Sequence, residues 1–310
     1  MKRELALAAT MAALAVLLGI AAPGFFAFGN LWNLASDSAG PVLAALAACA
    51  VLMAGHIDVS VGALYAVCGV ICGLCARSGA PWPAVAAAVL AAGVGVGAAQ
   101  GALVGALRVP SILATLASMA ILRGALRWGS GGQWIQELPS SFQWYGLGQA
   151  GGQAVILGIM IFATLALAGF FVRTAAGRKV LALGEVPAAA VLLGVRPART
   201  TALVFMIAGA LVALASLASF PRYPAVEIET GIGLELDAIA AVALGGATSV
   251  RSGRAVLRTL LGAALLRLVG ATFVYLHLEP AWERALQGAI LLVAVAGERV
   301  ASPKEAVTHA

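Results

Sequence analysis

Long apolar runs, separated by short polar or Gly- and Pro-containing breaks, repeat along almost the whole chain. Each run covers roughly 15 to 25 residues, which is the length of a membrane-spanning helix. The runs are rich in Ala, Leu and Val and lack the two-residue alternation of membrane β-strands. The pattern predicts an all-α transmembrane protein of about ten helices, at about 5–22, 41–55, 61–76, 84–107, 111–128, 153–172, 200–220, 231–246, 255–276 and 281–296.

A cationic segment at mid-chain divides this pattern into two halves. It spans residues 173–199, and its part from Gly184 to Pro197 is punctuated by Gly and Pro, which predicts a short structured loop. A loop of this kind between membrane helices is a place where a cytosolic partner would dock. We expect a single polytopic domain with a short polar cytoplasmic tail, divided into a first half (1–172), the coupling loop (173–199), a second half (200–298) and the tail (299–310).

The distribution of charge gives this topology an orientation. The chain is 62% hydrophobic and only 10% charged, whereas soluble domains are about 25% charged. With ten spans both termini lie on one side, and most of the 19 Lys and Arg fall on that side, which the positive-inside rule makes cytoplasmic. The net charge of +6 does not indicate nucleic-acid binding, because the basic residues lie at span ends rather than in one cluster with aromatic residues.

Small residues inside the apolar runs predict close helix packing. Gly93, Gly97, Gly101 and Gly105 recur every four residues and therefore share one helix face, which is typical of tight helix–helix contact in lipid. The four cysteines also lie inside apolar runs, where free Cys behaves as a small hydrophobe. We expect neither a metal site nor redox chemistry from them.

Acidic side chains within apolar runs are the candidates for a transport pathway. Asp58 interrupts the first half and Asp237 the second, and paired interruptions in the two halves point to inverted repeats with broken helices. His56, Ser60 and Glu235 accompany them. The alternative interpretation is that Asp58 and Asp237 cap helices. Both can hold, since a cap at a helix break can also line a pathway.

The chain has no means of its own to use ATP. None of its lysines follows a glycine, so a phosphate-binding G-x-x-x-x-G-K-[ST] loop is absent. No nucleophile–base pair or metal-ligand spacing is present, and we expect neither enzymatic activity nor a cofactor in this chain. If ATP drives transport, a separate subunit binds it.

Four ordered motifs resemble the permease subunits of bacterial sugar ABC importers of the ribose/galactose/xylose/arabinose type, within the branched-chain-amino-acid/sugar permease superfamily. Residues 54–63 (AGHIDVSVGA) resemble T-G-G-I-D-L-S-V-G-S, and residues 109–116 (VPSILATL) with Arg123-Gly124 resemble V-P-x-F-I-A-T-L…R-G. Residues 177–195 and 234–246 (LELDAIAAVALGG) match two further motifs in order. Residues 131–139 (GGQWIQELP) are most similar to the autoinducer-2 and rhamnose-type subgroup.

This resemblance implies an importer that moves a monosaccharide or sugar-like solute into the cytoplasm by alternating access. It implies a cytosolic ABC ATPase, a periplasmic or lipid-anchored sugar-binding protein and a second permease chain in the bacterial inner membrane, and no nucleic acid. The ATPase would couple through the loop, at Gly184, Glu185, Ala189, Ala190, Gly194 and Arg196.

Two departures from the family pattern bear on these expectations. His56 replaces a Gly, and Val186 stands where the family has Asn. Two other classes of function remain open: a proton- or ion-coupled secondary carrier that uses Asp58 and Asp237, and an interaction scaffold in which the loop binds a partner and nothing crosses. The candidate pathway residues are too few for a tight sugar site, so we expect only weak binding of the solute by this chain.

Overall fold

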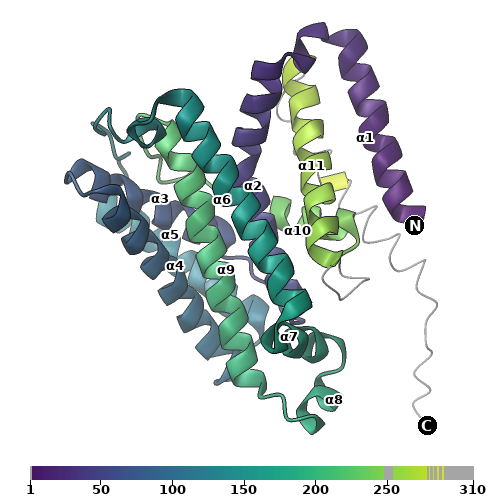
Figure 1. Ribbon diagram of the computed structural model, residues 1–310. Coiled ribbons are helices and arrows are strands. Elements are labelled where there is room, and N and C mark those ends of the chain that lie inside the picture. The colour runs from purple at the N-terminus through teal and green to yellow at the C-terminus, as the bar shows by residue number, and fades with distance from the viewer. Residues whose placement is uncertain are drawn as a thin grey trace.

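The computed structural model describes residues 2–247 and 254–277 and the single positions 279, 282, 285, 288 and 289. Within that part the chain is all-α, apart from one isolated antiparallel bridge between Ile135 and Val226 (Figure 1). The helices are α1 (Lys2–Ala21), α2 (Phe28–Met53), α3 (Val61–Arg77), α4 (Trp82–Gly105), α5 (Ser111–Ser130), α6 (Gly148–Arg173), α7 (Ala175–Glu185), α8 (Pro187–Leu192), α9 (Pro197–Ser219), α10 (Leu234–Gly245) and α11 (Arg254–Tyr275), with 3-10 turns η1 (Pro23–Phe26), η2 (Gln143–Gly146) and η3 (Phe220–Arg222).

The described part contains five helices that are long and apolar enough to cross a membrane, namely α2, α4, α6, α9 with η3, and α11. The apolar part of α1 and the whole of α3 are shorter. The run predicted at 231–246 does not form a full span, because α10 has 12 residues and so is about 18 Å long, against about 30 Å of hydrocarbon. The expected span at 281–296 lies almost entirely, and the tail wholly, outside the described residues.

Helix α2 begins well before the predicted start of its span at residue 41. It continues through Ser36, Ser38 and Pro41. The two serine hydroxyls donate to the carbonyls of Trp32 and Leu34, at 2.9 and 2.6 Å, so these polar residues are satisfied within the helix. A proline is tolerated inside a membrane helix when its neighbours compensate for the lost hydrogen bond. The polar residues before residue 41 therefore extend the helix instead of ending it.

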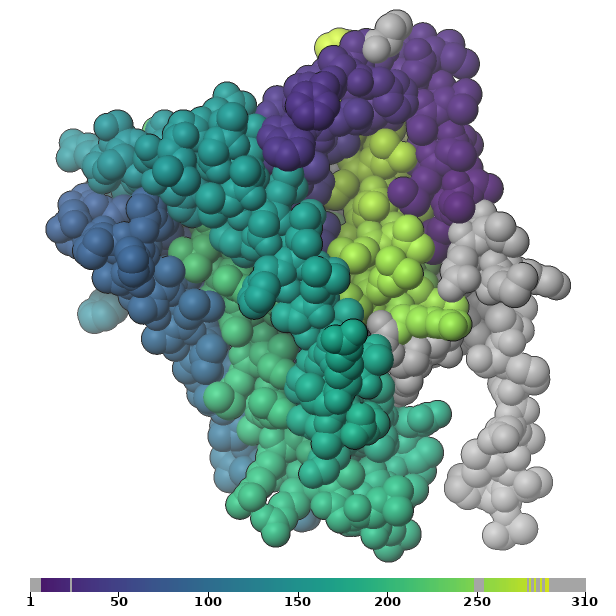
Figure 2. Space-filling model, in the orientation of Figure 1, coloured from purple at the N-terminus to yellow at the C-terminus, as the bar shows by residue number. Residues whose placement is uncertain are grey.

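The segment predicted as a coupling loop is largely helical. Thr174 caps α7, its hydroxyl accepting a hydrogen bond from the Gly177 N–H at 2.9 Å. Pro187 opens α8 at a position where its missing N–H costs nothing. Gly194, with φ at +82°, ends this helix in the left-handed conformation. Pro and Gly therefore separate two short helices here, and the intervening residues stay helical. Figure 2 shows α7 and α8 at the end of the molecule opposite the connection between α1 and α2.

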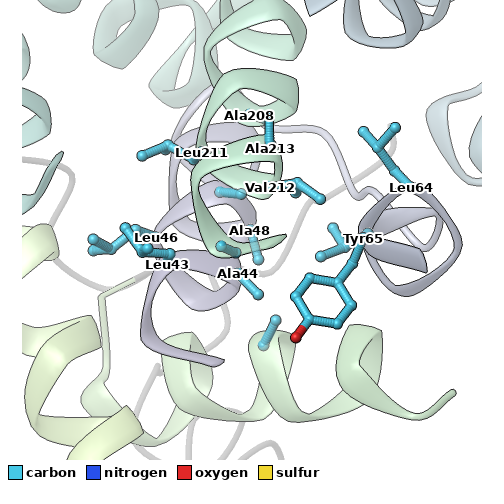
Figure 3. Packing of buried hydrophobic residues seen from close by; sticks show 14 of the residues in the cluster. Leu43, Ala44, Leu46, Ala48, Leu64, Tyr65, Ala208, Leu211, Val212 and Ala213 are labelled. Carbon is cyan, nitrogen blue, oxygen red and sulfur yellow. The ribbon is translucent and has the colours of Figure 1, made fainter. Parts of the chain in front are cut away.

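The core lies where α2, α3 and α9 meet. Figure 3 shows Leu43 and Leu46 of α2 beside Leu211 of α9, with Tyr65 of α3 near the same cluster. All residues of α2 from 42 to 51 are buried, and many of them are alanines. Small side chains let the helix backbones approach closely, which is how helices associate in lipid.

The glycines of α4 bring this helix against α9. A Cβ atom added at Gly101 would lie 2.5 Å from the Cα of Ala202, and one at Gly105 would lie 2.7 Å from the Ala198 carbonyl oxygen. Gly93 and Gly97 face the α9 backbone equally closely. Gly95, on another face of α4, has nothing within 4 Å of its Cβ position. The four-residue glycine spacing therefore coincides with the face that packs against α9.

The two part-length helices, α3 and α10, run in opposite directions. Helix α3 is parallel to α9, because Ser216 near the end of α9 donates to the Tyr65 carbonyl at 2.8 Å, whereas Thr201 near its start contacts the residues before α3. Helix α10 is antiparallel to α11, since Gly245 at its end faces Arg258 near the start of α11. Helix α11 ends beside the α1–α2 connection, where the rings of Tyr275 and Phe25 are 5.1 Å apart. It follows that α3 points away from the α7–α8 end of the molecule, and α10 points toward it.

Candidate functional site

An irregular segment of residues 54–60, which we call the break, joins α2 to α3. Its backbone amides find partners on α5: the Ile57 N–H donates to the Ser111 hydroxyl and the Val59 N–H to the Thr115 hydroxyl, both at 3.2 Å. A non-helical backbone inside a membrane protein persists only where such partners replace the helical hydrogen bonds. The sequence folds this way because Gly55, at φ +82°, ends α2 in the left-handed conformation.

A buried polar cluster follows the break. One carboxylate oxygen of Asp58 accepts hydrogen bonds from the Ser60 N–H at 2.8 Å and from the Ser60 hydroxyl at 2.7 Å. Gln100 of α4 donates to the same hydroxyl at 2.6 Å. All three side chains are buried. Asp58 thus closes a turn immediately before α3. It does not cap the helix, because no side chain caps α3 at its N-cap residue, Ser60. Gln100 connects this turn to α4.

The N-terminal ends of α3 and α10 meet at two glycines. A Cβ atom at Gly62 would collide with the Gly231 carbonyl oxygen and the Glu235 carboxylate, and one at Gly231 would lie 2.7 Å from the Gly62 carbonyl oxygen. Glu235 also accepts a hydrogen bond from the Gly233 N–H at 3.2 Å. We call this point the glycine crossing. Part-length helices whose N-terminal ends come together near mid-membrane are typical of the substrate sites of transporters with inverted repeats.

The five predicted pathway residues do not gather in one cavity. Asp58 and Ser60 belong to the buried cluster, and Glu235 lies at the glycine crossing. Asp237 faces α11, with its carboxylate 4.0 Å from the Arg267 guanidinium. His56 points to the opposite side of the break, where its Nε2 lies 3.1 Å from the Thr201 hydroxyl. The five residues therefore lie at separate places in the fold and do not form one site.

The segment between η3 and α10 is fastened to α5. Arg123 donates to the carbonyl oxygens of Ile228 and Thr230, both at 3.1 Å. One turn further on, Arg127 forms an exposed ion pair with Glu229 at 2.9 Å. The bridge from Ile135 to Val226 holds the beginning of the same segment. These contacts hold residues 226–230, which lead to the glycine crossing, on the side of the molecule opposite α7 and α8.

The predicted coupling residues lie along α7, α8 and the start of α9. Gly184 and Glu185 end α7, Ala189 and Ala190 lie in α8, and Gly194 and Arg196 follow it. Ala190 is buried, whereas the apolar side chains at the tip are exposed, namely Val186, Val191, Leu192 and Leu193. Exposed apolar residues grouped in this way mark an interaction surface. Gly55 of the break packs against Gly184, its Cβ position being 3.5 Å from the Gly184 Cα.

Sequence reasoning assigned no role to several residues of this site, although Ser111, Thr115 and Arg123 lie within a quoted motif. Gln100, Arg123 and Arg267 lie inside predicted spans. Because it is costly to place a polar or charged side chain in a membrane, their positions could have indicated a functional role. Ser111 and Thr115 gave no such signal, since hydroxyls in membrane helices normally bond to their own helix. Among the described residues no cluster of His, Cys, Asp and Glu suited to a metal ion is found.

Comparison with known proteins gives a consistent result over nearly the whole chain. The model of a family described as "Branched-chain amino acid transport system / permease component" matches residues 30–295. The autoinducer 2 import system permease protein LsrC of Enterobacter sp. (strain 638) is 34% identical over 290 residues, covering 94% of this chain and 84% of that protein. The LsrC proteins of Klebsiella pneumoniae subsp. pneumoniae and Escherichia coli O157:H7 are 35% and 31% identical, covering 94% and 91% of this chain and 84% of each relative. No solved structure matches.

Proposed function

The chain belongs to the branched-chain amino acid transport system / permease component family, and from this premise we propose that it carries a sugar-like solute of the autoinducer 2 class into the bacterial cytoplasm. The observation that carries the proposal is the similarity to autoinducer 2 permeases over 94% of the chain. The glycine crossing supports it, because two part-length helices that meet at their N-terminal ends are typical of transporters with inverted repeats. The chain is a multi-pass inner-membrane protein and has no enzymatic role of its own.

ATP hydrolysis on a separate cytosolic subunit drives alternating access, and this chain binds no cofactor. We assign the docking of that subunit to α7 and α8, where exposed apolar residues such as Leu192 and Leu193 lie beside Arg196. The contact of Gly184 with Gly55 then joins the docking surface to the break. A movement of α7 is transmitted through the break to the polar cluster around Asp58.

The topology that we adopt has ten membrane segments, of which α10 is only part-length, with both termini in the cytoplasm. Its orientation follows from the positive-inside rule, with Arg173, Arg178, Lys179, Arg196 and Arg199 all near the α7–α8 end. This end is then cytoplasmic, and the end that carries Arg127 and Glu229 faces outward. A solute-binding protein delivers its cargo on that outward side.

A second permease chain covers α5 and α10. Helix α5 exposes large apolar residues along most of its length, including Leu113 and Ile121, and Leu236 of α10 is also exposed. The side chains of Asp237 and Arg267 stay 29% and 28% exposed within apolar helices. Charged groups in a membrane face protein or a water-filled path rather than lipid. The solute path therefore runs along this face, between two chains.

Co-purification with the ATPase tests the proposal directly. The chain is expressed with candidate ATPase subunits and affinity-purified, with and without the paired changes Arg196→Glu and Glu185→Arg. Both side chains are exposed, so the variants should fold. We expect an ATPase to co-purify with the unaltered chain and to be lost from the variant. If no nucleotide-binding subunit associates and transport responds to uncouplers, the importer proposal is wrong.

A secondary carrier would be distinguished by Asp58→Asn. The amide retains an oxygen that can accept the two Ser60 hydrogen bonds, so the importer should lose only rate or assembly yield. A carrier that couples through a proton on Asp58 would lose transport outright. Rates in vesicles at matched protein amounts separate the two outcomes. If the protein is only an interaction scaffold, neither the unaltered chain nor the Asp58→Asn variant will transport the solute.

A further inference from the structure

A cavity lies on the side of the break that faces away from the glycine crossing. Its volume is about 670 Å³, within the range of small-molecule sites. It is bounded by the break, the end of α4, the end of α7 and the start of α9, and is lined by Ala54, Gly55, His56, Val104, Gly105, Ala106, Arg108, Leu183, Gly184, Pro187, Pro197, Ala198 and Thr201. We call it the inner cavity.

The polar side chains that line the inner cavity are those of Arg108, Thr201 and His56, and only the guanidinium is a pure hydrogen-bond donor. Arg108 contributes a guanidinium, Thr201 a hydroxyl and His56 a ring whose Nε2 already contacts that hydroxyl at 3.1 Å. No acidic or amide side chain is among the described lining residues. Glu185 is the next residue after Gly184, but it is exposed and outside the lining. The cavity therefore carries net positive charge.

Arg108 is held in an unusual backbone conformation. Its φ of +58° is left-handed, which is uncommon for a residue with a side chain. It follows the end of α4 and precedes Val109 and Pro110, which lead into α5. In the described part of the chain no hydrogen bond or ion pair engages its guanidinium. All of its donors are thus available to a ligand.

This combination suits a phosphate better than a neutral sugar. Sugar hydroxyls need acceptors as well as donors, and among the described lining side chains only Thr201 and His56 can accept, and these two already contact each other. A phosphate group accepts several hydrogen bonds at once and pairs with arginine through two parallel bonds. We propose that the inner cavity binds the phosphate group of a ligand, with Arg108 as its principal partner and Thr201 and His56 beside it.

Two sources present the same group at this place. Under the proposed topology, on which this inference rests, the inner cavity opens toward the cytoplasm, where soluble phosphate monoesters occur. It also lies at the level where basic pockets between membrane helices bind anionic lipid headgroups. In either case the ligand would join Arg108 to the break beside Gly184, and so would restrain the contact between α7 and the break.

The test measures the binding of defined phosphates to the full-length chain in phosphatidylcholine nanodiscs. One arm titrates ribose 5-phosphate, with ribose as the neutral control, and records the thermal unfolding midpoint. The other arm replaces part of the phosphatidylcholine by phosphatidylglycerol. We expect a rise in the midpoint in at least one arm and none with ribose. The arm that responds identifies the source.

Matched variants assign the effect to the cavity. Arg108→Gln removes the charge at an exposed position and should weaken binding about tenfold or more, as expected for the loss of a charge-assisted phosphate contact. Arg199→Gln removes an equal charge from the first turn of α9, outside the lining, and should leave binding unchanged. Thr201→Val provides a second lining variant and should also weaken binding.

Three results would overturn the inference: no response to either phosphate source, full binding by Arg108→Gln, or equal weakening by Arg199→Gln. The assay uses neither the ATPase nor transport, so its failure leaves the proposed importer function intact. Conversely, a failure to recruit an ATPase would leave phosphate binding to the inner cavity unaffected.

Discussion

At the scale of single residues, the packing of α4 against α9 depends on the absence of side chains. Gly97 faces the backbone at Phe205 so closely that even a methyl group cannot be placed there without a shift of one helix. Gly95, two residues earlier on the same helix, faces open space. The two glycines therefore form a matched pair for substitution.

We expect Gly97→Ala to destabilise the protein by about 1–3 kcal/mol, because overpacking forces the helix backbones apart. Gly95→Ala should be neutral or slightly stabilising, since alanine favours the helix. Thermal unfolding in detergent measures both. Equal unfolding midpoints for the two variants would contradict the assigned packing face.

Asp58 allows a second prediction at this scale. Asp58→Ala removes the acceptor of the Ser60 N–H and hydroxyl in a buried place, which should cost about 1–3 kcal/mol. Asp58→Asn, which retains an acceptor, should cost less. Unfolding midpoints for the two variants test the order, and an alanine variant as stable as the asparagine variant would show that the carboxylate does not hold the turn.

Several of these residue positions could be predicted from the sequence, and others could not. The four-residue spacing of the glycines sufficed to place them on one helix face. The position of His56 did not follow from the sequence, because a residue in an irregular break has no periodicity to fix its direction. It faces α9 and the inner cavity, whereas Asp58, two residues away, faces the polar cluster.

At the scale of elements, Arg123 connects two segments that are far apart in sequence. Its guanidinium binds two carbonyls of the segment before α10, whereas the neighbouring Arg127 makes only an exposed ion pair. Arg123 is half-buried and Arg127 is exposed. The contribution of each arginine should therefore differ.

Arg123→Gln should loosen residues 226–231 and speed amide hydrogen exchange there, because a shorter neutral side chain does not reach both carbonyls. Arg127→Gln should change stability by no more than about 1 kcal/mol, the usual limit for an exposed ion pair. Hydrogen exchange of the two variants, followed by mass spectrometry, makes the comparison. Faster exchange in Arg127→Gln alone would show that Arg127, and not Arg123, holds residues 226–231 in place.

The glycine crossing supplies a prediction about transport. Gly62→Ala should displace the start of α10, because the added methyl collides with the Gly231 carbonyl and the Glu235 carboxylate. We expect a loss of solute uptake greater than tenfold. The control is Gly158→Ala on α6, which has nothing within 4 Å of the added atom. Uptake is measured in vesicles that contain equal amounts of each variant. Unchanged uptake by Gly62→Ala would show that the glycine crossing is not part of the transport path.

The helices could largely be predicted where a long apolar run forms a single membrane-spanning helix. Runs such as 84–107 and 111–128 became helices close to their predicted bounds. Within the segment predicted as a structured loop, 173–199, Gly and Pro separate short helices, which the sequence pattern did not specify. The prediction of a full span at 231–246 was wrong, because only 12 residues there form a helix, and apolar composition alone does not reveal this.

At the scale of the whole molecule, the exposed face of α5 predicts the contact between permease chains. Gly124 has nothing within 4 Å of its Cβ position and lies beside exposed apolar residues such as Ile121. If two copies meet there with a two-fold axis close to Gly124, the two Gly124 positions approach each other. A cysteine at Gly124 should then form a disulfide between chains under oxidation, in a background in which the native cysteines are replaced.

The cross-linking experiment has an internal control. Gly158→Cys on α6 is also unobstructed but lies outside the proposed interface, so it should not cross-link. A Gly124 cross-link to a different permease chain would indicate a pair of related chains. Equal cross-linking at both positions would mean that contacts between chains are unspecific and that α5 does not form the interface.

The glycine crossing has a further consequence for the cell. Because Gly62 and Gly231 meet without room for a methyl group, no water molecule fits between the two backbones at the crossing. We therefore expect a chain that is synthesised in excess of its partners not to conduct protons through this contact while it is in the membrane.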